Sequence, residues 1–485
     1  MKAIALSIPF LPAVAGVIAL SRWRRIASWT GVTAPALVLV GGAVLGLFVA
    51  KGEVVEVFDG LVRVDALSAW MILLIGIVAL IATTYGVGYM AAEVAQGHTN
   101  AKGARIYYAL VQGFVAAMLV AVSTDNLGVM WVAVEATTIA TAFLVGHRHT
   151  RASVEASWKY VVIASVGVTV AFLGTVLVYF ASRHGSGATM RWSELVSAAG
   201  QLDPGVMRTA VGLLVVGYGT KAGLAPLHTW LPDAHSQAPA PVSALMSGVL
   251  VSVAVYAILR VKVISDLTLG PDHLRVLLLI AGVASVLLAG ALLLAQTDYK
   301  RLLAYSSIEH VGLMAIGAAI GSRLAVAGLL LHMLGHGIAK AVGFCASGDI
   351  LLASGSTRIA DTTALLSRRP ATGGAFGLAL LALLGFPPFS LFASELAILR
   401  AGFAADMGWA ASLTAAGLLV VFGAVLVYGQ RMLLGRPVTE TSWGSDSRAT
   451  MVVPLAGGLI LVAAIGVWMG PLQPLMEAAA SVISS

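Results

Sequence analysis

Ionisable side chains stand inside segments of this chain that are otherwise apolar, and Lys221 is the first of them to consider. It lies in residues 211–226, an apolar and glycine-rich run long enough to be embedded in a membrane. A lysine at the centre of a membrane helix costs about 2.5–3.5 kcal/mol on insertion scales, so it needs a partner or a purpose. Glycines before Lys221 and Pro226 after it are typical of a helix interrupted within the bilayer, where proton pumps expose an ionisable group to internal water. The pattern predicts an ion-conducting membrane protein.

Glu135 lies near the middle of a second apolar run, residues 126–146. A carboxylate close to Lys221 would favour the ammonium form of the lysine, whereas burial opposes it, so the two could act as one proton switch. The alternatives are that Glu135 is a structural acid neutralised by burial or by a hydrogen bond, and that Lys221 is only a structural ion-pair partner. Because buried ion pairs are weak stabilisers, the switch is the preferred interpretation.

His332, His336 and Lys340 follow the spacing i, i+4, i+8 within the apolar run 324–353. Helical residues at this spacing share one face, so we expect the three side chains in a row. Histidine titrates near neutral pH, which favours a proton relay. Metal binding by the two histidines is the alternative, and it is disfavoured because no obvious third ligand accompanies them.

Further titratable residues lie in neighbouring segments. Glu395 stands seven residues after Pro388 at helical depth; it is a candidate for the ion path, and the alternative is an acid near a helix end at the outer interface. Glu309 and His310 are adjacent in another apolar run, and both function and packing are open for them. His228, which follows the first helix break, is a candidate accessory residue.

Composition excludes a soluble fold for a chain of this length. Hydrophobic residues make up 59% of the 485 residues, charged residues make up 11%, and the mean hydropathy is +0.94. These values predict an all-α polytopic membrane protein. The net charge of +7 comes from basic residues scattered over short loops, so it indicates membrane topology rather than nucleic-acid binding. With a single cysteine, Cys345, and no Walker or GxGxxG motif, we expect no cofactor, no metal and no catalytic centre in this chain.

Apolar runs of roughly 18–25 residues recur along the chain and predict about fourteen membrane helices. The expected spans are 3–20, 32–50, 66–90, 106–123, 126–146, 158–181, 206–226, 242–262, 275–296, 302–320, 324–353, 372–399, 408–430 and 450–470. An amphipathic tail follows Pro471. The first span lacks a small-residue cleavage site, so we expect a retained helix rather than a signal peptide. Basic residues are more frequent in the loops of one side, Lys300 among them, which predicts an N-terminus outside the cell.

Two of the expected spans contain helix-breaking residues. The seventh breaks near Pro226, and the twelfth, five spans later, breaks at residues 385–388. Paired interruptions at corresponding positions of two halves predict a five-helix repeat with an ion path at each break. The expected organisation is helices 1–3 in residues 1–105, a first repeat in 106–262, a second repeat in 263–430, and helix 14 with its tail in 431–485.

Four segments together resemble the antiporter-like membrane subunits of respiratory complex I, of Mrp-type sodium/proton antiporters and of energy-converting hydrogenases. They are the Glu135 helix, the Lys221 helix running into Trp230-Leu231-Pro232-Asp233-Ala234-His235, the His332/His336/Lys340 helix, and the Pro387-Pro388 break with Glu395. The resemblance covers roughly residues 60–435 and is closest to the hydrogenase-4 (formate hydrogenlyase type) membrane subunits of the component F kind. It implies two inverted five-helix repeats and a proton path through Glu135, Lys221, His332, His336, Lys340 and Glu395.

Ser252 departs from the family pattern, because many complex I relatives have a lysine at this position. A serine cannot hold a proton near neutral pH, so the link between the two half-channels must use water or His332. The difference bears on pumping rather than on the fold.

The expected function is that of a proton-translocating subunit of a redox-driven complex of hydrogenase or NADH:quinone oxidoreductase type, without a redox centre of its own. The alternatives are a subunit of a multi-subunit sodium/proton antiporter and a channel-inactive membrane scaffold. The expected partners are other membrane and peripheral subunits, the lipid bilayer, and protons or sodium, with no nucleic acid. The expected location is a bacterial or archaeal plasma membrane.

Overall fold

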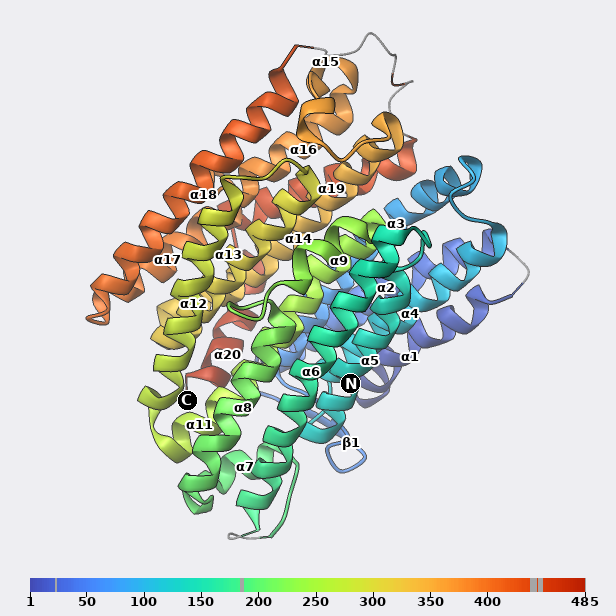
Figure 1. Cartoon of the computed structure of the whole chain (residues 1–485). Coiled ribbons are helices and arrows are strands. Elements are labelled where there is room, and N and C mark those ends of the chain that lie inside the picture. The colour runs from blue at the N-terminus through green and yellow to red at the C-terminus, as the bar shows by residue number, and fades with distance from the viewer. Residues whose placement is uncertain (22–23, 184–186, 437–442, 444–447, 485) are drawn as a thin grey trace.

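The helices of the chain lie side by side in one bundle, as the computed structural model of the protein shows (Figure 1). The structure describes residues 1–21, 24–183, 187–436, 443 and 448–484. Within these residues, twelve helices are long and apolar enough to cross a membrane. The fold is that of an all-α polytopic membrane protein, as the composition predicts.

The first six spans are unbroken helices. They are α1 (Lys2–Ala19), α2 (Arg24–Val49), α3 (Ala66–Ala95), α4 (Ala101–Val122), α5 (Leu127–Val145) and α6 (Arg151–Ser182). A small hairpin before α3 pairs β1 (Val55–Val57) antiparallel with β2 (Val62–Val64). Two short elements follow α6, namely α7 (Trp192–Ser197) and η1 (Ala199–Gln201).

The unbroken spans of the second half begin with a composite helix. It consists of α10 (Ala240–Leu245), the π-helical turn η2 (Met246–Leu250) and α11 (Val251–Leu269). The others are α12 (Pro271–Leu293), α13 (Tyr299–Ile320), α14 (Arg323–Ser354), α18 (Gly408–Leu434) and α19 (Ala449–Val467). The short elements are η3 (Ile359–Asp361), α15 (Leu365–Arg368), η4 (Gly470–Leu472) and the C-terminal α20 (Gln473–Ile483).

Two spans are interrupted at the places that the sequence predicts. One consists of α8 (Pro204–Ala222) and α9 (Trp230–Gln237), the other of α16 (Pro370–Leu383) and α17 (Ser390–Ala404). With the twelve unbroken helices they account for the predicted number of about fourteen.

Side chains of α9 and α12 satisfy backbone groups at the first break. Gly223 ends α8 in the left-handed region, with φ at 85°. The indole of Trp230 donates to the carbonyl of Thr220 at 2.9 Å, and the amide of Ala225 donates to the Ser285 hydroxyl at 2.9 Å. Irregular backbone at membrane depth is tolerated only where such protein groups replace the missing helical bonds.

The sequence did not predict the π-helical turn within the eighth span, or the true ends of several helices, with the largest errors at the starts of α2 and α6. Helix α2 begins at residue 24 rather than 32, and α6 begins at 151 rather than 158. Hydropathy marks only the apolar part of a helix, whereas the backbone starts where the first amides find a cap. For α6 that cap is Thr150, whose hydroxyl accepts from the amide of Ser153 at 3.1 Å.

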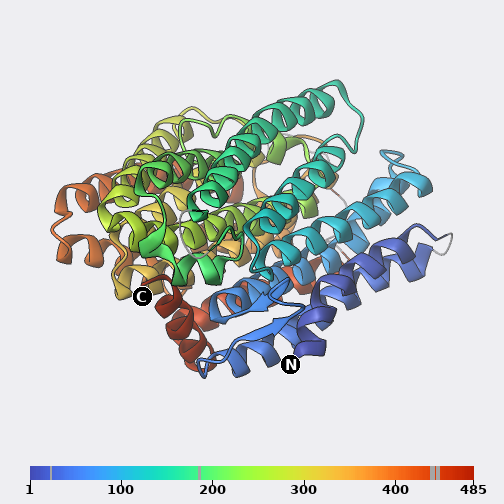
Figure 2. The same ribbon diagram turned by 90° about the horizontal axis from the view of Figure 1, so that it is seen from below.

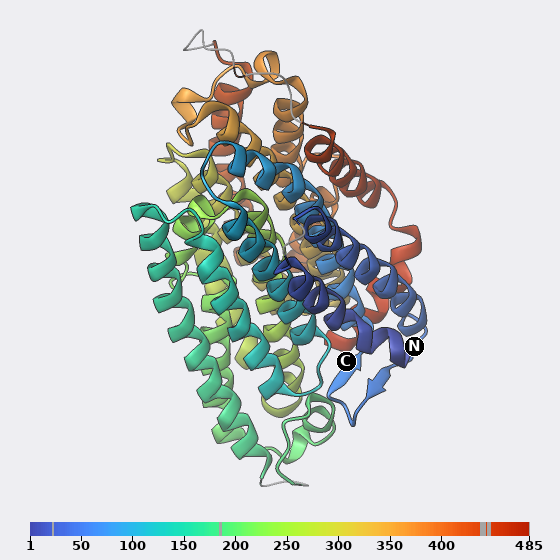
Figure 3. The same cartoon turned by 90° about the vertical axis from the view of Figure 1, so that its right-hand side faces the viewer.

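The N-terminal helices and two later helices lie at opposite edges of the bundle. Figure 2 shows α1 and α2 in blue at one edge and α17 and α18 in orange at the other. In Figure 3, α6 and α8 run together along the height of the molecule, and the two helices pack against each other. Helix α20 is amphipathic, as expected for the tail, since Leu475, Ala479 and Ile483 are buried on one face.

A buried ion pair joins the start of α3 to α11. The guanidinium of Arg260 donates two hydrogen bonds, each of 2.7 Å, to the two carboxylate oxygens of Asp65. Arg260 also donates to the hydroxyls of Tyr256 and Ser68 at 3.0 Å, and it lies 4.5 Å from the centre of the Trp192 ring. Burial opposes the ionisation of Asp65, but Arg260 prevails and holds the pKa of the carboxyl at about 2. The stabilising effect of this pair is therefore complete above the ordinary pKa of 3.8 and is lost as the pH falls towards 2.

We expect Asp65→Ala to destabilise the chain by about 3–5 kcal/mol, because it leaves the Arg260 guanidinium buried without its anion. Thermal unfolding of the detergent-solubilised protein measures the loss. The double variant Asp65→Leu with Arg260→Met removes both charges and should recover most of the stability. A single variant as stable as the parent would show that Arg260 finds another partner.

Candidate functional site

Lys221 is fully buried in the last turn of α8, and hydroxyl groups rather than a carboxylate hold its ammonium group. Its Nζ donates to Thr138 Oγ1 on α5 and to the Tyr160 hydroxyl on α6, both at 2.7 Å. The Tyr160 hydroxyl lies 2.6 Å from Thr141 Oγ1, one turn along α5 from Thr138. Three helices therefore converge on this lysine.

Glu135 reaches Lys221 through Thr138. The Thr138 hydroxyl donates to Glu135 Oε2 at 3.2 Å, and the Ser165 hydroxyl donates to Oε1 at 3.1 Å. In the part of the chain that the structure describes, the two charged groups form no direct ion pair. The switch predicted from the sequence thus takes the form of a chain Glu135–Thr138–Lys221, and Glu135 is only partly buried.

Thr138 was not predicted as a site residue, although it stands at i+3 from Glu135 on the same helix. Tyr160 was likewise missed, because its distance in sequence from Lys221 hides the contact. Only the packing of α5, α6 and α8 brings these hydroxyls to the lysine.

We expect Thr138→Val to lower ion translocation roughly ten- to a hundredfold, because a hydrogen bond to a charged group is worth about 1.5–3 kcal/mol. Thr137→Val is the matched control, since among the described residues the Thr137 hydroxyl bonds only to a carbonyl of its own helix. Ion flux into vesicles that hold the assembled protein measures both. Equal rates for the two variants would mean that the Thr138 bridge carries no protons.

The three predicted residues of α14 lie in a row and are fully buried. The rings of His332 and His336 are nearly parallel, with centres 6.3 Å apart. Lys340 does not bond to either histidine. Its Nζ donates to the carbonyl of Leu303 at 2.7 Å and to the Ser306 hydroxyl, both on α13.

His310 on α13 completes a cluster of three histidine rings. Its Nδ1 lies 3.1 Å from His332 Nε2, and its ring centre is 4.9 Å from that of His336. The other nitrogen of His332, Nδ1, lies 2.9 Å from the Ser394 hydroxyl on α17. Neither ring nitrogen of His336 has a partner among the described residues. Buried polar atoms of this kind are usually satisfied by water.

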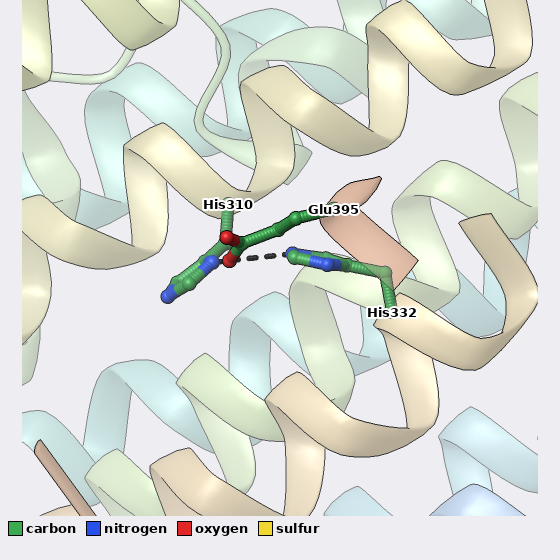
Figure 4. A group of neighbouring side chains, drawn as sticks. All are labelled: His310, His332 and Glu395. Carbon is green, nitrogen blue, oxygen red and sulfur yellow. Dashed lines mark hydrogen bonds between the residues drawn. The ribbon is translucent and has the colours of Figure 1, made fainter. Parts of the chain in front are cut away.

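Two carboxylates lie at the end of this cluster. The carboxylate of Glu395 points toward His310 and His332, and one ligand atom from each of the three residues lies within 4.8 Å of the others (Figure 4). Glu309 is buried, and neither of its carboxylate oxygens has a hydrogen-bond partner among the described residues. Glu309 and Glu395 both line a cavity of about 300 Å³ that is otherwise apolar, between α13, α16, α17 and α18.

The second helix break makes room for Glu395. Gly385 has a φ of 64°, and a Cβ at this position would lie 2.5 Å from Glu395 Oε2. A glycine is required here both for the left-handed backbone and for the approach of the carboxylate.

The composite span α10–η2–α11 contributes buried hydroxyl groups. Ser252 is fully buried, and its hydroxyl donates to the carbonyl of Gly248 at 3.4 Å in its own helix. Beside the π-helical turn, the hydroxyls of Ser247 and Ser307 lie 2.7 Å apart and link η2 to α13. Among the described residues, no direct contact joins Ser252 to Lys221 or to His332.

The remaining candidate, His228, lies in the loop between α8 and α9, and its Nδ1 has no partner among the described residues. Two further buried groups were not predicted. Both ring nitrogens of His235 on α9 also lack partners within the described chain. Lys300, expected in a loop, is buried at the start of α13 and donates to the carbonyl of Ala238 at 2.8 Å. Lys300 was assigned to a loop because it is charged and stands just before an apolar run. Helix α13 in fact begins one residue earlier, at Tyr299.

Comparison with known proteins places this architecture in a family. Residues 124–421 match the model of the NADH:quinone oxidoreductase/Mrp antiporter transmembrane family, and residues 59–97 match that of the N-terminus of chain 5 of NADH-ubiquinone oxidoreductase (complex I). The hydrogenase-4 component F homolog of Methylacidiphilum infernorum is 38% identical over 385 residues, which cover 78% of this chain and 79% of that protein.

Two solved structures share the fold. A chain of the membrane-bound sulfane sulfur reductase, an archaeal respiratory membrane complex, superposes with a TM-score of 0.87 at 24% identity, covering 100% of this chain and 97% of that chain. A chain of the Mrp complex from Dietzia sp. DQ12-45-1b superposes with a TM-score of 0.86 at 20% identity, covering 100% and 98%. On the extent of the family match and the identity to the hydrogenase-4 homolog, this chain belongs to the NADH:quinone oxidoreductase/Mrp antiporter transmembrane family.

Proposed function

We propose that this chain is the proton-translocating membrane subunit of a redox-driven complex, of energy-converting hydrogenase or NADH:quinone oxidoreductase type. The observation that carries the proposal is the hydrogen-bonded link from Glu135 through Thr138 to the buried Lys221. A lysine ammonium in an apolar bundle is retained at a cost, and a hydroxyl bridge to a carboxylate gives its proton a place to go. The most similar relative reported above, a hydrogenase-4 component F homolog, favours the hydrogenase type.

In this proposal protons move between two clusters. Glu135 and Lys221 exchange a proton through the Thr138 hydroxyl in the first cluster. His336, His332 and His310 carry it along α14 and α13 in the second, where Lys340 and Glu395 stand at the two ends. Water next to Ser252 and His336 bridges the gap, since His336 offers two unpartnered nitrogens and water needs two to four polar partners.

We also propose the organisation that the sequence suggests. Residues 106–262 and 263–430 form two inverted repeats, and each contains one interrupted span. The N-terminus faces outward across a bacterial or archaeal plasma membrane, because basic residues are more frequent in the loops assigned to the inside. A protease-sensitive tag ahead of Lys2 that is cleaved only after the membrane is permeabilised would contradict this orientation.

An antiporter subunit is the second candidate. The similarity to a chain of an Mrp complex supports it at the level of the fold. In that case the same clusters would exchange sodium for protons without a redox partner. A channel-inactive scaffold is the third candidate, and it rests on Ser252 in place of a titratable group.

Purification of the intact assembly from its native membrane tests the proposal. Mass spectrometry should identify nickel–iron hydrogenase or iron–sulfur subunits together with this chain, and the reconstituted assembly should acidify or alkalinise vesicles when its redox substrates are added. Small antiporter subunits in place of redox subunits, with sodium-dependent proton flux, would establish the second candidate instead. A redox assembly that turns over its substrates without moving ions would support the third candidate, the channel-inactive scaffold.

A further inference from the structure

Two histidine nitrogens and a carboxylate face one another at the junction of α13, α14 and α17 (Figure 4). His310 Nδ1 and His332 Nε2 are 3.1 Å apart, and all three ligand atoms of His310, His332 and Glu395 lie within 4.8 Å of one another. Zinc binds histidine nitrogen at about 2.0–2.1 Å, so neighbouring ligands of a tetrahedral site stand roughly 3.3 Å apart. The histidine pair already has nearly this separation, and only the carboxylate has to move closer. We propose that these three residues form a binding site for Zn²⁺.

The groups around the trio orient both rings as metal ligands. His332 uses its other nitrogen, Nδ1, to contact the Ser394 hydroxyl at 2.9 Å, which turns Nε2 toward His310. The other nitrogen of His310, Nε2, lies 3.5 Å from Glu309 Oε2 without a hydrogen bond, and the charge of this carboxylate favours a proton on Nε2 and a free lone pair on Nδ1. Histidines that bind metals in proteins are almost always held in this way by a polar group on their second nitrogen.

The charges at the site suit a divalent cation. Glu395 supplies one negative charge as a ligand, and Glu309 supplies a second one next to His310. Glu309 is buried, and neither of its carboxylate oxygens has a hydrogen-bond partner among the described residues. Two carboxylates and one Zn²⁺ have no net charge, which lowers the cost of placing either charge in an apolar bundle.

The proposed zinc site is accessible through a cavity. Glu395 is only partly buried, and both carboxylates line the cavity of about 300 Å³ between α13, α16, α17 and α18. The volume is ample for a hydrated ion to approach and for a water molecule to fill the fourth tetrahedral position. Two imidazoles and one carboxylate suit zinc, whereas calcium and magnesium prefer sites built from oxygen ligands alone.

A bound ion would prevent His310, His332 and Glu395 together from exchanging protons, and this consequence rests on the proposed function. The proposal that zinc binds does not rest on that function. The metal site therefore has its own experiment, with metal binding rather than transport as the first measurement.

The experiment titrates the purified intact assembly with Zn²⁺ against a chromophoric chelator. It compares the parent with Glu395→Gln, His310→Gln and His332→Gln, each of which removes one ligand. We expect the parent to bind one zinc ion more tightly than each ligand variant by about a hundredfold or more, and Ser394→Ala to weaken binding by about ten- to a hundredfold, as outer-shell changes do. X-ray absorption at the zinc edge should report two imidazole ligands.

His336→Gln is the matched control. It lies on the same helix, is equally buried and contacts the His310 ring, but contributes no atom to the trio. It should bind zinc as the parent does, and parental zinc stoichiometry and affinity in all three ligand variants would overturn the site. Binding that depends on the trio without any inhibition of ion flux would keep the zinc site and contradict the role of the trio in the proton path.

Discussion

Lys221→Ala is expected to reduce ion translocation to the background leak while the assembly still forms. The ammonium donates to both Thr138 and Tyr160, so its removal takes away the proton-carrying end of the link to Glu135. The hydroxyls left behind keep other partners, since Thr138 still reaches Glu135 and Tyr160 still reaches Thr141. Assembly should therefore survive. Proton flux into vesicles, normalised to the amount of assembled complex, is the measurement.

Two further variants separate the loss of charge from the loss of packing. Lys221→Met keeps most of the buried side-chain volume and should be as inactive as Lys221→Ala. Thr220→Val changes the neighbouring residue and should translocate normally. Within the described chain, the Thr220 hydroxyl bonds only to the carbonyl of Val216 in its own helix. Flux at the parental rate in Lys221→Met would exclude the lysine as a proton carrier.

His332→Leu is expected to be nearly as damaging as Lys221→Ala. Both of its nitrogens are engaged, one with His310 and the other with Ser394, so the ring lies in a polar chain and not in an apolar contact. A leucine of similar volume removes both contacts and takes one titratable ring out of the histidine cluster. Because the change is roughly isosteric, the fold should hold and the loss should appear in ion flux alone.

The same substitution at His147 provides the control. His147 is also buried, but it lies after α5 and contacts the ring of Tyr107, away from both clusters. His147→Leu should therefore leave flux within about twofold of the parent. If His332→Leu and His147→Leu transport equally well, protons do not pass through His332.

Much of the fold could be predicted from the sequence, because the thickness of a bilayer fixes the length of the hydrophobic helices that cross it. The positions of both helix breaks also followed from local residues, since Pro226 and residues 385–388 mark them, and Gly223 and Gly385 take left-handed backbone a few residues before the prolines. Helix ends were less accurate, as at α2 and α6, because polar helical turns extend beyond the apolar core. The π-helical turn in the eighth span, where η2 packs against α14, had no signal in the residue pattern.

The candidate site was predicted residue by residue, but its connections were not. Glu135, Lys221, His332, His336, Lys340 and Glu395 are visible in sequence because a titratable group among apolar neighbours is costly in a membrane and therefore noticeable. Threonine, serine and tyrosine differ less from their apolar neighbours, so Thr138, Tyr160 and Ser394 were not predicted. Yet these residues make the hydrogen bonds to Lys221 and His332.

The sequence by itself determined that this is a membrane bundle with two broken helices and a set of ionisable groups inside it. Only the tertiary structure decided which groups meet. It placed a threonine between Glu135 and Lys221, turned Lys340 toward the backbone of α13, and brought Glu395 and His310 to His332 as ligands that the spacing along one helix could not supply. The physical reason is that hydrophobic periodicity and hydropathy describe one helix at a time. A hydrogen-bonded network is made by side chains from several helices, and the distance between two residues along the sequence does not tell how far apart they lie in space.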